Sequence, residues 1–174
     1  DYPRMCQSKV IMRELIKYRP EAIKYADISD LNDFNDLARF SLEYGYTPTV
    51  SDLNTNKLFG YSFDIMKYIV CDSPDAINQV NTYVTNLDEL VQLAIDNGFE
   101  GDFVSYDFLK SESALKYVIN KTGRMTENTK LIIKNMVRKT SYSIEMYEWF
   151  IEKGYKTEDI LDLFISNFDA MTII

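Results

Sequence analysis

The chain repeats itself, and this repetition constrains its fold more than any other feature. Residues 8–23 are similar to residues 62–77, at an offset of 54 positions. Both segments contain two apolar pairs separated by two residues, and the first of these two is basic in each copy, Arg13 and Lys67. Both close on proline, an acidic residue, alanine and isoleucine, at 20–23 and 74–77. Self-similarity at a fixed spacing indicates small structural units stacked side by side.

A second pair of segments follows in the same order. Residues 32–46 match residues 85–99, and both end on glycine followed by an aromatic residue. A weaker third copy runs over 111–123 and 143–155, which also contain a Lys-Tyr step and a Gly-Tyr ending. The period of about 54 residues divides into two halves of about 27, each with one amphipathic helical pattern.

The ends of these patterns carry helix signals. Gly45, Gly98 and Gly154 stand where a helix C-terminus favours a left-handed residue, and the aromatic residue that follows can fold back on the last turn. Pro20 and Pro74 suit the first turn of a new helix. Shorter helices are expected between the strong ones, at residues 20–27, 50–58, 74–84, 102–109, 126–137 and 157–166.

The sequence therefore predicts an all-α protein. We expect an α-solenoid of about six helix-turn-helix units, paired into three repeats of about 54 residues. It would form a single helical-repeat domain over residues 1–174. The closing segment 165–174 lacks a charged end, so it either folds back as a cap or the array continues in a longer natural chain. The second is favoured.

Aspartate recurs at every third position at the start of the second unit, at Asp27, Asp30, Asp33 and Asp36. An EF-hand calcium loop needs a glycine that this stretch lacks. The next copy has Glu89 in place of Asp36, which suits N-cap and first-turn positions where an oxygen acceptor satisfies free amides. Structural capping is the favoured interpretation, and a weak cation site and a docking patch are the alternatives.

Composition excludes several functions. The net charge of −8 argues against a nucleic-acid partner, since such proteins present basic stripes. The absence of histidine removes the commonest general base and zinc ligand. Cys6 and Cys71 are far apart and form neither a disulfide framework nor a metal motif, which favours a reducing, intracellular environment. No apolar run approaches the length of a membrane span.

Chemistry-bearing motifs are absent from the sequence. There is no glycine-rich nucleotide loop and no nucleophile elbow. Lys67-Tyr68 recurs as Lys116-Tyr117, which favours a scaffold role because a catalytic lysine is needed only once. Paired acids are expected on solvated faces in a chain with 27 of them. The pairs considered as acid–base couples are Asp88/Glu89, Glu145/Glu148 and Glu158/Asp159. The sequence assigns no catalytic, cofactor-binding or metal-binding residue.

The aromatic residues suggest surfaces. Trp149, the single tryptophan, aligns with Leu93, and this favours core packing over an interface anchor. The 13 tyrosines combine apolar area with a hydroxyl and suit protein interfaces. Those considered for a partner-binding surface are Tyr18, Tyr44, Tyr61, Tyr142 and Tyr147, and the partner-binding residues are otherwise unknown.

The segments 62–70, 111–123 and 143–155 resemble divergent ankyrin-like repeats of large DNA viruses, whose second helix carries a similar Lys-Tyr-aliphatic step. The phrase at residues 20–25 also resembles other short helical repeats. The chain departs from ankyrin in lacking T-P-L-H and the G-A-D-x-N hairpin, so the resemblance transfers no site residue. It implies a helical solenoid that binds other proteins.

The leading hypothesis is a non-enzymatic module for protein–protein interaction or scaffolding, without a cofactor. Its expected surface is the concave face of successive helices, and its expected location is intracellular, in a cytoplasm or a virion. Self-assembly is an alternative use of the same surface. The alternative fold is a non-repetitive helical bundle, acting as a pathogen regulatory factor that binds a host protein through a hydrophobic groove. An enzyme that relies on carboxylates and tyrosine is the third hypothesis.

Overall fold

The chain is all-α wherever its structure is described. The computed structural model describes residues 5–109, 111–123, 125–127, 129–131, 133–134, 144–158 and 160. These residues form α-helices, short 3-10 helices and connecting turns, and none of them lies in a strand, which confirms the expected class. The chain divides into two compact units, Asp1–Thr122 and Gly123–Ile174. Each unit is described by itself.

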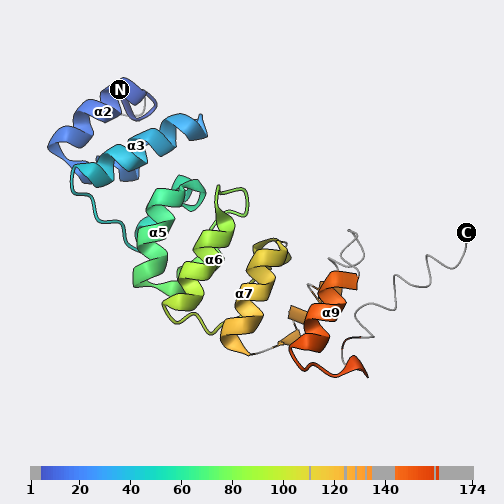
Figure 1. The fold of residues 1–174 in the computed structure, drawn as a ribbon. Coiled ribbons are helices and arrows are strands. Elements are labelled where there is room, and N and C mark those ends of the chain that lie inside the picture. Colours follow the sequence, from blue (N-terminus) through green and yellow to red (C-terminus); the bar gives the residue numbers. More distant parts are fainter. Residues whose placement is uncertain are drawn as a thin grey trace, which may run out of the picture. The chain divides into compact units, whose positions relative to one another are not determined.

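Long α-helices follow one another through the first unit, and each packs against the next along the chain: α2 on α3, α3 on α5, α5 on α6, and α6 on α7. Figure 1 shows α5, α6 and α7 side by side in this order. Their bounds are α2 Lys9–Tyr18, α3 Leu31–Glu43, α5 Phe63–Asp72, α6 Leu87–Asp96 and α7 Glu112–Thr122.

Short helices lie against successive pairs of the long ones. The 3-10 helix η1 contacts α2 and α3, η2 contacts α3 and α5, η3 contacts α5 and α6, and η4 contacts α6 and α7. Their bounds are η1 Pro20–Tyr25, η2 Lys57–Tyr61, η3 Pro74–Gln79 and η4 Tyr106–Leu109, with a four-residue helix α4 Asp52–Thr55 before η2. These are the short helices expected at 20–27, 50–58, 74–84 and 102–109, found as 3-10 turns and one short α-helix.

The matched segments adopt matched structures. At the offset of 54 residues, α2 falls on α5 and η1 falls on η3 without any shift. Pro20 and Pro74 each occupy the first turn of a 3-10 helix, where a missing amide proton costs nothing. Three residues later Ile23 and Ile77 are fully buried, and each carbonyl accepts the amide that ends the helix. One proline and one buried isoleucine therefore fix each short helix.

Glycine ends three of the long helices in the predicted way. Gly45 has φ +93°, Gly98 has φ +98° and Gly154 has φ +82°, backbone angles that favour a residue without a Cβ. The next residue then donates its amide to a carbonyl five residues earlier. Tyr46 donates to Ser41 and Phe99 to Ala94, both at 2.9 Å. The side chains of Tyr46 and Phe99 are buried, so the expected fold-back on the last turn is confirmed.

Aromatic side chains fill the space between the long and short helices of the first unit. The ring of Phe59 in η2 lies 5.9 Å from that of Phe34 in α3 and 6.1 Å from that of Tyr46. A second group joins Phe99, Phe103 and Phe108 at centroid distances of 4.9 and 5.7 Å. Such tilted pairs add to the stabilisation from buried area, so they help to hold η2 and η4 against the long helices.

The second unit contains α9, Ile144–Glu152. Met146 and Phe150 of α9 are buried, and the ring of Phe150 meets Tyr155 edge-on at 5.5 Å. Parts of the short helices expected at 126–137 and 157–166 lie outside the described residues, as do Tyr142 and the closing segment 165–174. Among the described helices, none has the length and apolar character needed to cross a bilayer.

Candidate functional site

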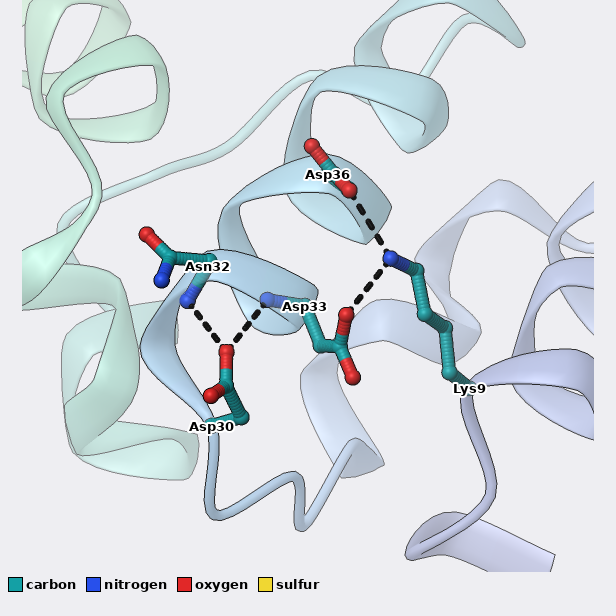
Figure 2. A network of polar contacts seen from close by, with 5 residues as sticks. All are labelled: Lys9, Asp30, Asn32, Asp33 and Asp36. Carbon is teal, nitrogen blue, oxygen red and sulfur yellow. Dashed lines mark hydrogen bonds and ion pairs between the residues drawn. The ribbon is translucent and has the colours of Figure 1, made fainter.

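The aspartate row at residues 27–36 is divided among several separate roles (Figure 2). Asp30 is the N-cap of α3, and its Oδ1 accepts the amides of Asn32 at 2.9 Å and Asp33 at 3.0 Å. Asp33 and Asp36 both accept from Nζ of Lys9 in α2, at 2.6 and 2.8 Å. The capping interpretation is confirmed for Asp30, whereas Asp36 lies beyond the first turn and ties α3 to α2.

Lys9 is therefore the cation that this acidic stretch binds. Its hydrogen bonds to Asp33 and Asp36 raise the pKa of its ammonium group, and the same contact lowers the pKa of the Asp36 carboxyl. Asp27 accepts separately from the Gln7 amide at 3.0 Å. Within the described ranges, no three or more acidic or cysteine side chains are grouped so that they could hold a metal ion.

Ion pairs of the same kind join the following helices. Arg39 of α3 pairs with Asp64 of α5 at 3.2 Å, and Lys67 of α5 pairs with Glu89 of α6 at 3.1 Å. Glu89, which aligns with Asp36, lies in the first turn of α6 as predicted, and like Asp36 it pairs with a lysine of another long helix. These exposed pairs contribute little stability each, so their value is in fixing the register of neighbouring helices.

The contact between α6 and α7 is also polar at its surface. Asp96 accepts from the hydroxyl of Tyr117 at 2.6 Å and pairs with Lys121 at 3.1 Å. These hydrogen bonds lower the pKa of Asp96, and the bond to Asp96 raises the pKa of Tyr117. Lys116, the neighbour of Tyr117, pairs with Glu112 within its own helix. In α7 the Lys-Tyr step therefore places one side chain against α6 and the other in an intrahelical pair, whereas Tyr68 of the copy in α5 is exposed.

The paired acids do not form acid–base couples where the structure describes both members. Asp88 accepts a hydrogen bond from the Ser111 hydroxyl, while Glu89 pairs with Lys67. Glu145 and Glu148 are both exposed on α9. Glu158 is exposed, and Asp159 lies outside the described residues. Where the structure describes both members of a pair, it gives them no shared buried site.

Asp52 is the buried carboxylate that the sequence did not single out. Its side chain is 5% exposed, and Nζ of Lys24 lies 2.7 Å away. One oxygen accepts from the Tyr46 hydroxyl at 2.8 Å, the Thr49 amide at 2.9 Å and the Thr49 hydroxyl at 3.0 Å. The cluster ties the C-terminal end of α3 to the start of α4 and to η1, and Asn56 reinforces it by donating to the Ala26 carbonyl at 2.8 Å.

These contacts set the protonation of the cluster. Burial alone would raise the pKa of Asp52, but Lys24, the Thr49 groups and the Tyr46 hydroxyl together hold it below its usual range. Burial first, and then the hydrogen bond to Asp52, raise the pKa of Tyr46. Asp52 is therefore an anion and Tyr46 a neutral donor at physiological pH. With its oxygens occupied by donors, the cluster acts as a structural clamp.

The Asp52 cluster gave only a weak signal in the sequence. Thr49-Val-Ser-Asp52 has the spacing of a side chain that bonds a backbone amide three positions earlier. The contribution of Lys24, which lies in η1, could not be predicted from spacing because only the packing of η1 beside α4 brings it there.

Trp149 does not lie in the core as the alignment favoured. It is partly exposed, and so is its counterpart Leu93, while Phe150 and Ala94 are the buried residues one position further on. The alignment of the two helices is correct, since Phe150 and Ala94 accept equivalent C-terminal hydrogen bonds. Trp149 packs edge-on against Phe150 at 5.1 Å, with Lys153 over its ring at 5.8 Å.

The tyrosines considered for a partner surface are distributed over several elements. Tyr18 is 83% exposed at the end of α2, and Tyr44 is 45% exposed after α3. Tyr61 and Tyr147 are partly exposed. The abundance of tyrosine indicated a protein interface, but it could not predict which tyrosines are exposed. Tyr83, which the sequence did not single out, is 87% exposed in the turn before α6.

A hollow of about 350 Å³ lies between η2 and the end of η3. Tyr61, Gln79 and Asn81 are among its lining residues. Two of the lining residues are joined through the backbone, since the Asn81 amide donates to the Gly60 carbonyl at 2.8 Å. A Cβ on Gly60 would lie 3.0 Å from the Gln79 carbonyl oxygen, so a larger residue would push the two short helices apart.

Comparison of the chain with protein-family models, with curated proteins and with solved structures gives no match.

Proposed function

We propose that this chain is a non-enzymatic helical-repeat module, an α-solenoid that acts by binding another protein. The observation that carries the proposal is the spread of exposed tyrosine along the first unit. Tyr25 is 64% exposed at the end of η1, Tyr68 is 53% exposed on α5, and Tyr83 is 87% exposed before α6. Tyrosine gives large contact area at a small entropic cost and is enriched at protein interfaces.

The order of helix contacts supports the solenoid part of the proposal. Each long helix of the first unit packs on the next, and a 3-10 helix lies against each successive pair. In an array of this kind each further helical repeat enlarges the exposed surface, which suits the binding of an extended partner protein. The hollow between η2 and η3 adds carboxamide groups of Gln79 and Asn81, which can pair with a peptide backbone.

Capture of a partner tests this function. The tagged chain is incubated at physiological salt with lysate of its native source, and bound proteins are quantified by mass spectrometry. An unrelated helical protein of equal acidity is the control for charge. We expect one dominant partner above that control, and a loss of capture in Tyr68→Ala and Tyr83→Ala.

Val104→Ala is the matched variant, because Val104 is 72% exposed and is not aromatic. Its capture should equal that of the unchanged chain. If no protein exceeds the acidic control, or if the two tyrosine variants capture as well as Val104→Ala, the proposed function is wrong.

A further inference from the structure

The hollow between η2 and η3 is lined by polar side chains that the chain itself leaves without partners. Asn54, Lys57 and Gln79 are exposed lining residues, and Tyr61 is a partly exposed one. Within the described residues, these four side chains take part in no hydrogen bond or ion pair. Ammonium, carboxamide and phenol groups all carry hydrogen-bond donors. The hollow therefore presents donors that a ligand can use.

Lys57 differs from the other basic residues that the structure describes in the first unit. Each of the others forms an ion pair, apart from Arg13, whose guanidinium lies 4.1 Å from the centroid of the Phe40 ring. Lys57 has neither kind of neighbour among the described residues. In a chain with 27 acidic and 19 basic residues, a cation without an acidic neighbour is unusual. Its charge is therefore left for a ligand.

The first copy of the repeat shows what occupies the corresponding place. The Asp27 amide donates to the Cys6 carbonyl at 2.9 Å. At the offset of 54 residues, the Asn81 amide donates to the Gly60 carbonyl at 2.8 Å. In the first copy the Gln7 carboxamide also donates to the Asp27 carboxylate at 3.0 Å. The chain thus supplies a carboxylate of its own beside this backbone hydrogen bond.

The second copy lacks that carboxylate. Asn81 stands at the position of Asp27, and Tyr61 stands at the position of Gln7. Oδ1 of Asn81 accepts the Tyr83 amide at 3.0 Å, which leaves the two N–H groups of the Asn81 carboxamide as donors. A donor therefore replaces the acceptor of the first copy, and a carboxylate from another molecule would restore the pairing.

Size and charge narrow the class of ligand. A hollow of about 350 Å³ is near the small end of ligand pockets, so it suits one side chain with its adjoining backbone. Leu53 and Val80 also line it and can contact the methylene groups of that side chain. No acidic residue is among the described residues that line the hollow. Asp52, which precedes Leu53, is balanced by Lys24 at 2.7 Å, and repulsion from more distant acids is screened beyond about 8 Å at physiological salt.

We propose that the hollow between η2 and η3 binds an acidic residue of an extended peptide, with Lys57 and the Asn81 carboxamide on its carboxylate. This inference rests on the proposed binding of another protein, and it names the chemistry that the partner presents. We expect glutamate to bind more tightly than aspartate, because its additional methylene gives more apolar contact with Leu53 and Val80.

Selection from a display library of random heptapeptides tests the inference. The full chain is immobilised at physiological salt, and the bound peptides are sequenced. We expect glutamate to be enriched at one position. In a selected peptide, its replacement by glutamine should raise the dissociation constant about tenfold, because a charge-assisted hydrogen bond is lost.

Variants at Lys57 locate the site. Lys57→Gln should weaken binding by a similar factor, and Lys57→Glu should select lysine or arginine at the position where the unchanged chain selects glutamate. Lys57 is exposed, so both variants should keep the helix content of the unchanged chain, which circular dichroism checks. Lys156→Gln is the matched control, because Lys156 is an exposed lysine of the second unit and does not line the hollow. It should select the same peptides as the unchanged chain.

Several results would overturn the inference. They are the absence of any enriched peptide, enrichment without a preferred acidic position, and an acidic preference that survives Lys57→Gln. Competition by N-acetylglutamate amide as strong as by the selected peptide would show a site for a free carboxylate and refute the peptide ligand. The proposed function is tested separately by capture from lysate through Tyr68 and Tyr83, neither of which lines the hollow, so the two failures are distinguishable.

Discussion

Replacement of Asp52 by asparagine should destabilise the first unit far more than the loss of an exposed ion pair. The change keeps the size of the side chain and removes its charge. Lys24 then loses its carboxylate at 2.7 Å, and the neutral amide must replace an anion that accepts from the Tyr46 hydroxyl and from two groups of Thr49. One amide oxygen cannot satisfy these donors as well as the carboxylate does.

The magnitude follows from burial. Breaking a buried ion pair by removing one partner costs about 3–5 kcal/mol, since the remaining charge is left without compensation. The side chain of Lys24 is 28% exposed and can still reach water, which lowers the cost to about 2–4 kcal/mol. Asp64→Asn is the matched control. It removes the charge from the exposed pair with Arg39, whose side chain is 62% exposed, and should cost under about 1 kcal/mol.

Urea unfolding measures both variants. Far-ultraviolet circular dichroism follows the helices of both units, and the fluorescence of Trp149, the single tryptophan, follows the second unit. We expect Asp52→Asn to move the dichroism transition to clearly lower urea. An effect of Asp52→Asn no larger than that of Asp64→Asn would refute the idea that this carboxylate is a buried clamp.

The pH dependence of folding stability should also show that Asp52 is ionised in the folded chain. The folded pKa of Asp52 is lowered, so its contribution is present above the unfolded value of about 3.9 and is lost as the pH falls through the folded value. The stability gap between the unchanged chain and Asp52→Asn should therefore close in acid. A gap that stays constant down to acidic pH would contradict the assigned protonation.

Three further changes test the fold. Gly98→Ala should cost roughly 1–2 kcal/mol in urea unfolding. Its φ is +98° and an added Cβ would meet no atom within 4 Å, so backbone strain is the penalty. Ile77→Ala should cost about 2–5 kcal/mol in the same assay, since its fully buried side chain holds η3. Because the pKa of Tyr46 is raised in the folded chain, its contribution to folding stability is complete below the unfolded value of about 10 and is lost as the pH rises further toward the folded value. In an alkaline titration, Tyr46→Phe should therefore give the same tyrosinate absorbance as the unchanged chain while folded, and one tyrosinate fewer after unfolding.

Local rules explain why so much of the helix pattern could be predicted. Pro20 and Pro74 start short helices because proline lacks the amide that a first turn leaves free. Gly45 and Gly98 end long helices because only glycine adopts their φ without strain. The type of the short helices, 3-10 and not α, was not anticipated, since both types share the same start signals over six residues.

Side-chain roles were harder to predict, because neighbours outside the local segment decide them. Trp149 aligns with Leu93, but a position near the edge of a helical stripe is buried only when a neighbour lies over it. The sequence by itself determined that the chain is helical, where its helices stop, and that one block recurs as α2 with η1 and as α5 with η3. Only the tertiary structure decided that Asp52 is a buried anion. It also decided that the side chains of Ile11 and Leu15 are exposed, whereas the matching Ile65 and Ile69 are buried. The reason is physical: caps and backbone angles depend on residues a few positions away, whereas burial and ion pairing depend on which helix comes to lie alongside.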